Sequence, residues 1–103
     1  MSKNAQADKK QLRAIGHKLK PVVTVAGKGL SDAVLGEIER ALSDHELIKV
    51  KLAVGDRDAR AAVSRQICER CGAREVQAIG NVVLLLRRAP EPDPRLSNLL
   101  RPV

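Results

Sequence analysis

The hydrophobic pattern of this chain switches repeatedly between the helical and the strand period, which limits the possible folds more than any other feature. Residues 8–19 carry apolar side chains at helical spacing and are followed by Pro21, which ends a helix. In residues 47–54 apolar positions alternate instead with Lys49 and Lys51. Because strands separated by helices favour parallel pairing with right-handed crossovers, the pattern predicts a single compact α/β domain.

The expected elements follow in the order α-β-α-β-α-β-β. Helices are predicted over residues 8–19, from the N-cap Ser31 to about His45, and over about 57–71, where Gly72 is a stop signal. Strands are predicted over residues 21–26, 47–54, 75–79 and 82–88. Gly80-Asn81 is typical of a two-residue hairpin, so the last strand should be antiparallel and complete a mixed four-stranded sheet.

The expected domain covers residues 8–88. Residues 1–7 are polar and are predicted to be disordered, and residues 89–103, which contain four prolines, are predicted to form a tail. No apolar run approaches the roughly 18–20 residues that cross a bilayer, and the N-terminus lacks the apolar core of a signal peptide. We therefore expect a cytoplasmic protein with reduced cysteines and no membrane partner.

The charge is concentrated at one end of a chain that lacks aromatic residues. None of the 103 residues is Phe, Tyr or Trp, so the core must consist of Leu, Ile, Val and Ala, and bases cannot stack on aromatic rings. The net charge is +7, and residues 1–30 hold seven Lys or Arg against one Asp, which gives +6. This cluster favours a polyanionic partner such as RNA, DNA or an acidic membrane, although a solvated, solubilising surface is the alternative.

A glycine-containing turn joins the first strand to the second helix and is the most informative local motif. Gly27-Lys28-Gly29 precedes Ser31, so backbone N–H groups and the positive end of a helix dipole should meet there. A nucleotide site is disfavoured, because the Walker A pattern is absent and Asp32 stands where GxGxxG requires its last glycine. A purely structural turn stays open. The favoured interpretation is a clamp for an RNA backbone, like the GXXG loop of KH domains.

Catalytic and metal-binding interpretations find less support in the sequence. Cys68 and Cys71 form a single CxxC at the end of a predicted helix, without the second ligand pair that a structural zinc site needs. They are expected to be core residues, although a redox or metal protein remains the rival hypothesis. His17 could contact a phosphate or be merely exposed, and His45 should pack at a helix end. No triad or HExxH pattern occurs, so we expect no catalytic residue, no metal, no cofactor and no small-molecule substrate.

Four segments in register resemble a known family. They are Leu19-Lys20-Pro21-Val22-Val23, Gly27-Lys28-Gly29-Leu30-Ser31, Glu46-Leu47-Ile48-Lys49-Val50-Lys51 and Val76-Gln77-Ala78-Ile79-Gly80. In this order and spacing they are similar to the CRM domain, named for chloroplast RNA splicing and ribosome maturation, and to its stand-alone bacterial YhbY-like form. The likeness covers about residues 10–88.

The resemblance implies a non-enzymatic RNA-binding domain whose fold is similar to the C-terminal domain of translation initiation factor three. It also implies a large-subunit ribosome assembly factor that contacts structured precursor ribosomal RNA, and we expect this protein to be a monomer. The GxxG loop of the family falls on Ala26-Gly27-Lys28-Gly29, so Ala26 replaces the first glycine. Asn81 and Leu86 stand where the family often has a lysine and a tyrosine.

The expected RNA-binding residues combine the basic side of the first helix, the loop, one face of the second strand and the end of the last strand. They are Lys9, Lys10, Arg13, His17, Lys18, Lys20, Gly27, Lys28, Gly29, Lys49, Lys51 and Arg87. For Lys49 and Lys51, a role in keeping the sheet face solvated is an equal alternative. A protein-interaction adaptor with a basic docking helix is the remaining rival.

Overall fold

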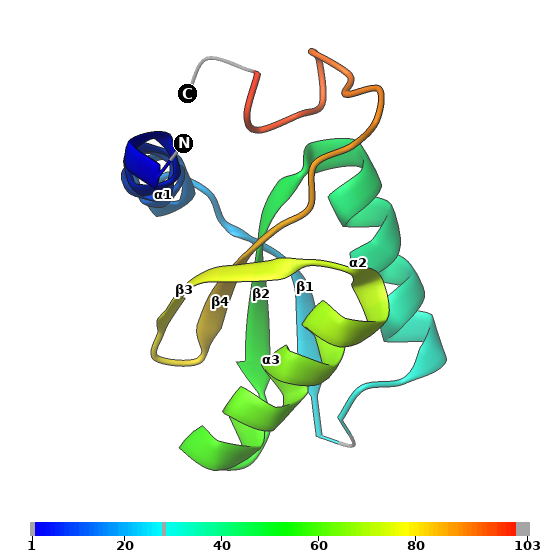
Figure 1. Ribbon diagram of the computed structural model, residues 1–103. Helices are drawn as coiled ribbons and strands as arrows, with labels where there is room; N and C mark the ends of the chain where they lie inside the picture. The colour runs from blue at the N-terminus through cyan, green and yellow to red at the C-terminus, as the bar shows by residue number, and fades with distance from the viewer. Residues whose placement is uncertain (1, 28, 101–103) are drawn as a thin grey trace.

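The computed structural model describes residues 2–27 and 29–100, in which helices and strands alternate in the expected order (Figure 1). The elements are α1 (Ser2–His17), β1 (Pro21–Ala26), α2 (Asp32–His45), β2 (Leu47–Ala53), α3 (Arg57–Cys71), β3 (Arg74–Ile79) and β4 (Val82–Leu86). The predicted α/β class and element order are confirmed. None of the helices in the described ranges is both long and apolar enough to cross a membrane.

The sheet is mixed, with the strand order β1-β2-β4-β3. β1 and β2 are parallel, whereas β4 is antiparallel to both β2 and β3. The tight turn at Gly80, whose φ is 59°, keeps β4 beside β3. The connection from β2 through α3 leads to β3, which is not the neighbour of β2. β4 lies between β2 and β3 and pairs with both.

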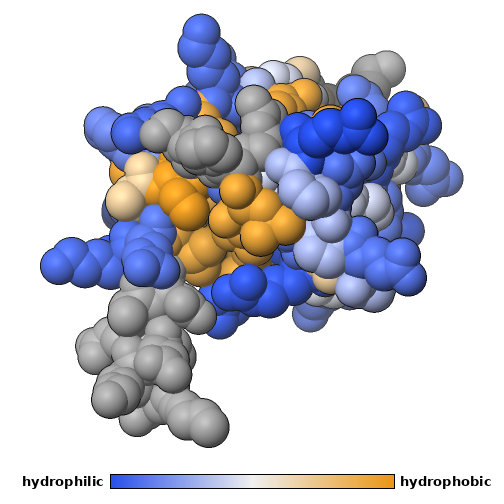
Figure 2. Space-filling model, turned by 90° about the horizontal axis from the view of Figure 1, so that it is seen from above, coloured by the Kyte–Doolittle hydropathy of each residue, from blue (hydrophilic) through white to orange (hydrophobic). Residues whose placement is uncertain are grey.

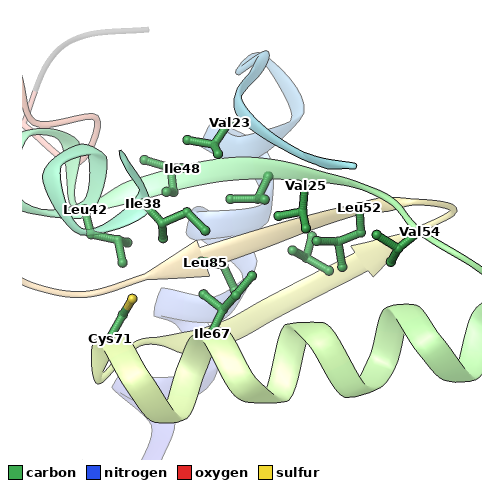
Figure 3. Close-up of a cluster of buried hydrophobic side chains, with 12 residues drawn as sticks. Val23, Val25, Ile38, Leu42, Ile48, Leu52, Val54, Ile67, Cys71 and Leu85 are labelled. Carbon is green, nitrogen blue, oxygen red and sulfur yellow. The ribbon is translucent and has the colours of Figure 1, made fainter. Parts of the chain in front are cut away.

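Two apolar clusters hold the layers together, one on each face of the sheet. The larger cluster packs Ile38 and Leu42 of α2 and Ile67 of α3 against strand residues such as Val25 and Leu85 (Figure 3). The smaller cluster packs α1 on the opposite face and consists of Leu12, Leu47, Val76, Leu84 and Leu86. β4 therefore contributes alternate residues to the two clusters, which explains its continuous apolar sequence.

Local signals set the helix ends where the sequence predicted them. The Ser31 hydroxyl accepts the Val34 amide of α2 at 3.2 Å, and the Asp56 carboxylate accepts the Ala59 amide of α3 at 2.9 Å. Gly72 ends α3 in the left-handed conformation. These contacts satisfy helix-end groups that would otherwise lack partners, and they fix the loops on either side of the sheet.

The N-terminal helix is longer than predicted, and its position is tightly constrained. α1 begins at Ser2, so residues 2–7, which we expected to be disordered, continue the helix. Alanine, glutamine and lysine in this segment favour helix propagation from the amphipathic part. A Cβ atom at Gly16 would lie 2.5 Å from Cδ2 of the buried Leu84, so any larger residue here would force the Leu84 side chain to move.

Residues 89–100 are not a free tail but dock on the domain, which corrects the expectation. The buried Ser97 hydroxyl donates to Oε1 of Glu46 at 2.6 Å, and the Ala89 amide donates to Oε2 at 2.5 Å. The Asn98 side-chain amide donates to the Leu47 carbonyl at 2.7 Å. These donors satisfy the buried carboxylate of Glu46, which would be costly to bury without partners, and so they favour docking of the segment.

This C-terminal segment and α1 share one side of the molecule (Figure 1). Figure 2 looks onto that side and shows hydrophobic side chains gathered near its centre, surrounded by hydrophilic ones. Leu96 and Leu100 are exposed residues of the segment, and Leu99 packs against the α1 cluster. The basic surface of α1 therefore borders an apolar area.

Candidate functional site

The glycine turn after β1 is open to solvent and conformationally specialised. Gly27 and Gly29 have φ values of 43° and 87°, and the Gly29 amide donates to the Ala26 carbonyl at 3.0 Å. No heavy atom lies within 4 Å of a Cβ built at either glycine. Glycine is therefore required here by the backbone conformation, and the open space lets a ligand approach the backbone closely. Lys28 lies outside the described residues.

Alanine at the first position of the GxxG-like turn is compatible with its structure. Within residues 2–27 and 29–100, Glu46 is the non-glycine residue with positive φ, so Ala26 has an ordinary backbone conformation. Among the described residues of the turn, the positions with positive φ are Gly27 and Gly29. The departure from the family pattern at Ala26 therefore leaves the turn intact.

The N-terminus of α2 follows the turn directly. Its dipole places partial positive charge beside the loop, which is the arrangement that attracts phosphate groups. The N-cap hydroxyl of Ser31 is already engaged with Val34, and Asp32 in the first turn partly offsets the dipole. Because the Gly29 amide is also engaged, with the Ala26 carbonyl, the turn offers an anion mainly open space beside the positive end of the α2 dipole, and positive side chains have to come from other elements.

The basic side of α1 is exposed as predicted. Leu12 is buried and, with the partly buried Ile15 and Leu19, fixes the opposite side of the helix against the sheet. The exposed basic residues are Lys9, Lys10, Arg13, His17, Lys18 and Lys20. They form a charged surface on the side of the sheet that faces away from α2 and α3.

Lys49 and Lys51 lie on the same face of the sheet as α1. On β2 the residues Ile48, Val50 and Leu52 belong to the cluster beneath α2 and α3, so the alternate positions face the other way. Lys49 is paired across the strands with Leu84, which packs under α1. The predicted location of the two lysines on one sheet face is therefore correct.

The first helix and the turn, which we expected to combine in one RNA-binding surface, do not meet at one point. α1 precedes the first residue of β1, and the turn follows its last, so the strand of six residues separates them by about 20 Å. The two lysines fill this interval, because Lys49 pairs with Pro21 and Lys51 with Thr24. We call Lys20, Lys49, Lys51 and the turn the basic track.

Arg87 does not belong to this surface, which corrects its predicted role. Its Nη1 donates to both carboxylate oxygens of Glu39, at 2.7 and 2.8 Å, and to the Cys71 carbonyl at 2.9 Å. Its Nη2 donates to the Ser43 hydroxyl at 2.8 Å and to the Glu39 carbonyl at 3.1 Å. The hydrogen bonds from Arg87 lower the pKa of Glu39. Arg87 thus ties β4 to α2 and α3 on the far face.

The position of Arg87 could have been inferred from strand periodicity. It lies two and four residues after Leu85 and Val83, both of which pack beneath α2 and α3. Extending the alternation by one step places its side chain on that face. Glu39 and Ser43 are four residues apart on α2 and offer acceptors on one side of the helix.

The cysteines are core thiols rather than a reactive pair, with Cys71 buried and Cys68 partly buried. Cys71 belongs to the main core cluster, Cys68 packs against it, and neither forms a disulfide. Burial raises the pKa of both thiols, which keeps them protonated, whereas a nucleophilic cysteine needs a lowered pKa. Among the described residues there is no group of three or more His, Cys, Asp or Glu side chains that could hold a metal ion.

Comparisons with known proteins point to one family. A family model described as the CRS1/YhbY (CRM) domain matches residues 5–87. A protein of Pseudomonas aeruginosa named as a probable RNA-binding protein is 51% identical over 96 residues, which cover 93% of this chain and 92% of that protein. An RNA-binding protein of Haemophilus influenzae is 43% identical over 83 residues, which cover 81% of this chain and 84% of its own.

A solved structure matches the fold. The solution structure of a hypothetical protein from Staphylococcus aureus superimposes with a TM-score of 0.73 at 25% sequence identity. The match covers 81% of this chain and 86% of that chain. The shared part therefore contains most of the three-layer arrangement described above.

Proposed function

Because this chain belongs to the CRS1/YhbY (CRM) domain family, we propose that it is an RNA-binding protein that holds the phosphate backbone along the basic track. The names of the relatives support RNA as the ligand. The observation that supports the proposal is that Lys49 and Lys51 share the α1 face of β2, beside β1, which begins after the exposed Lys20 and ends at the open glycine turn.

The mode of binding follows from the side chains that are available. The chain has no aromatic residue, so bases cannot stack on aromatic rings, and lysine and arginine charge beside the open turn supplies the phosphate-binding part of the affinity. Phosphate contacts release counterions and make binding dependent on salt. If about four to six phosphates are neutralised, log Kd should change with log salt with a slope of about 3 to 5 in magnitude.

The proposed target is structured precursor ribosomal RNA in an assembling large subunit, bound by a monomer in the cytoplasm. This finer assignment rests on the resemblance of the chain to the YhbY-like branch of the family. The protein would act by binding and not by catalysis, which agrees with the raised pKa of the Cys68 and Cys71 thiols. Sedimentation of the protein with large-subunit particles before and after nuclease treatment distinguishes RNA binding from a protein-interaction adaptor.

The test is a charge reversal on the track compared with one on the opposite face. Lys49→Glu/Lys51→Glu should weaken binding to a fluorescent ribosomal RNA hairpin by at least tenfold at low salt and reduce the salt slope by about 2. Arg57→Glu/Arg65→Glu on α3 makes the same charge change at exposed positions. If both double variants lose affinity equally, only net charge matters and the track is not the binding site.

A further inference from the structure

α1 covers only part of its face of the sheet. Its cluster contains Leu47 at the start of β2 and Leu86 at the end of β4, so the helix lies over one end of these strands. The other end carries Lys51, paired with Val82, which is paired in turn with Ile79. In Figure 1, α1 lies at the upper end of the sheet, and the turn at Gly80 lies at the lower end.

A hollow of about 210 Å³ lies on the part of the face that α1 leaves open. Its lining comes from all four strands and consists of Pro21, Lys49, Gln77, Ile79, Val82 and Leu84. The floor is aliphatic, and Ile79 at its edge is 67% exposed. The space is much larger than one water molecule needs, and an exposed isoleucine gains from contact with an apolar surface.

The surroundings of the hollow select the kind of ligand. Lys49 lines the hollow, and Lys51 is paired across the strands with Val82, another lining residue. The ligand that fits these surroundings therefore has an apolar part joined to a negatively charged group. None of the described residues that line the hollow is acidic. The Gln77 side-chain amide offers both a donor and an acceptor, as the edge of a nucleobase requires. A nucleotide combines these properties in one unit: a flat apolar ring, polar edges and a phosphate.

We infer that this hollow receives an unstacked base from a single-stranded stretch of RNA, while the lysines beside it hold the adjoining phosphates. The inference rests on the proposed function and adds a base-binding subsite to it. Aliphatic side chains replace the aromatic platform that other single-strand binders use, so the ring is buried against Ile79, Val82 and Leu84 rather than stacked on another ring. Such a subsite favours RNA loops and bulges over continuous duplex.

The test compares a fluorescein-labelled RNA hairpin that has an oligouridine loop with the same hairpin carrying abasic riboses throughout the loop. The two probes have the same phosphates, so their affinity ratio isolates the contribution of the bases. The wild-type protein should bind the intact loop about tenfold more tightly, a difference of about 1.4 kcal/mol. Ile79→Ser should reduce this ratio to about one. Val22→Ser, a matched control at a 51% exposed valine outside the hollow, should preserve it.

Equal affinity of the wild-type protein for the two hairpins overturns the inference, and so does an Ile79→Ser variant that keeps the tenfold ratio. In both cases salt-dependent binding of the abasic hairpin remains, so the proposed backbone binding stands. Failure of the wild-type protein to bind either hairpin overturns the proposed function and the base subsite together.

Discussion

Replacing Arg87 with alanine should destabilise the fold while leaving RNA affinity unchanged. The guanidinium group donates five hydrogen bonds, to the Glu39 carboxylate and carbonyl, the Cys71 carbonyl and the Ser43 hydroxyl. Its side chain is 23% exposed and that of Glu39 is 48% exposed, so solvent screens part of the ion pair.

The expected decrease in the free energy of unfolding is larger than the roughly 0–1 kcal/mol contributed by an exposed ion pair. It is smaller than the roughly 3–5 kcal/mol lost when a buried ion pair is broken. Because the Cys71 carbonyl also loses a charged donor, we expect the free energy of unfolding to fall by about 2–3 kcal/mol. For a domain of this size, that corresponds to a decrease in Tm of roughly 10–20 °C.

The assay is chemical denaturation followed by circular dichroism, together with RNA titration at a temperature at which the Arg87→Ala variant is folded. Arg95→Ala is the control, because Arg95 is 93% exposed and its Nε lies 4.0 Å from the Asp93 carboxylate, so its loss should cost under about 1 kcal/mol. An Arg87→Ala variant with wild-type stability and lost RNA binding would refute the structural role.

Three further predictions follow from particular contacts. Because the pKa of Glu39 is lower in the folded state than its unfolded value near 4.5, its ion pair with Arg87 stabilises the fold above that pH, and this contribution should disappear as pH falls through the folded-state pKa. Glu39→Gln should therefore flatten this part of a curve of unfolding free energy against pH. A curve that the substitution leaves unchanged contradicts this. Ser97→Ala should cost about 2 kcal/mol in denaturant unfolding, because the Glu46 carboxylate loses its hydroxyl donor; an unaltered midpoint would show that the segment does not dock in solution. Gly29→Ala should lower the free energy of unfolding by about 1–2 kcal/mol, because alanine is strained at the φ of 87° that Gly29 adopts. Gly36→Ala inside α2 is the control and should be neutral or stabilising. Equal effects of the two substitutions would show that the turn is not strained.

Much of the fold was predictable because its signals are local. The N-cap at Ser31, the αL glycine at Gly72 and the hairpin at Gly80-Asn81 each act within a few residues, and each lies where the sequence indicated. The alternation in β2 also identified the face of Lys49 and Lys51 correctly. Local rules of this kind suffice for element order and for the side that each residue presents.

What the sequence did not reveal depends on contacts between distant residues. The docking of residues 89–100 depends on the pair Ser97 and Glu46, which are 51 residues apart. The four prolines of the C-terminal segment suggested a free tail, but tertiary hydrogen bonds outweighed that local preference. The apolar hollow was equally hidden, because it exists only through the register that brings Ile79 beside Val82 and Gln77 beside Leu84.

The most direct test of the basic track is a nuclear magnetic resonance titration of the isotopically labelled protein with the ribosomal RNA hairpin. The account predicts that the largest amide shifts occur at Gly27, Gly29 and Lys51 and along the exposed side of α1. Amides of α3, on the opposite side of the sheet, should stay in place. Shifts concentrated in α2 and α3, with the glycine turn unaffected, would contradict the account.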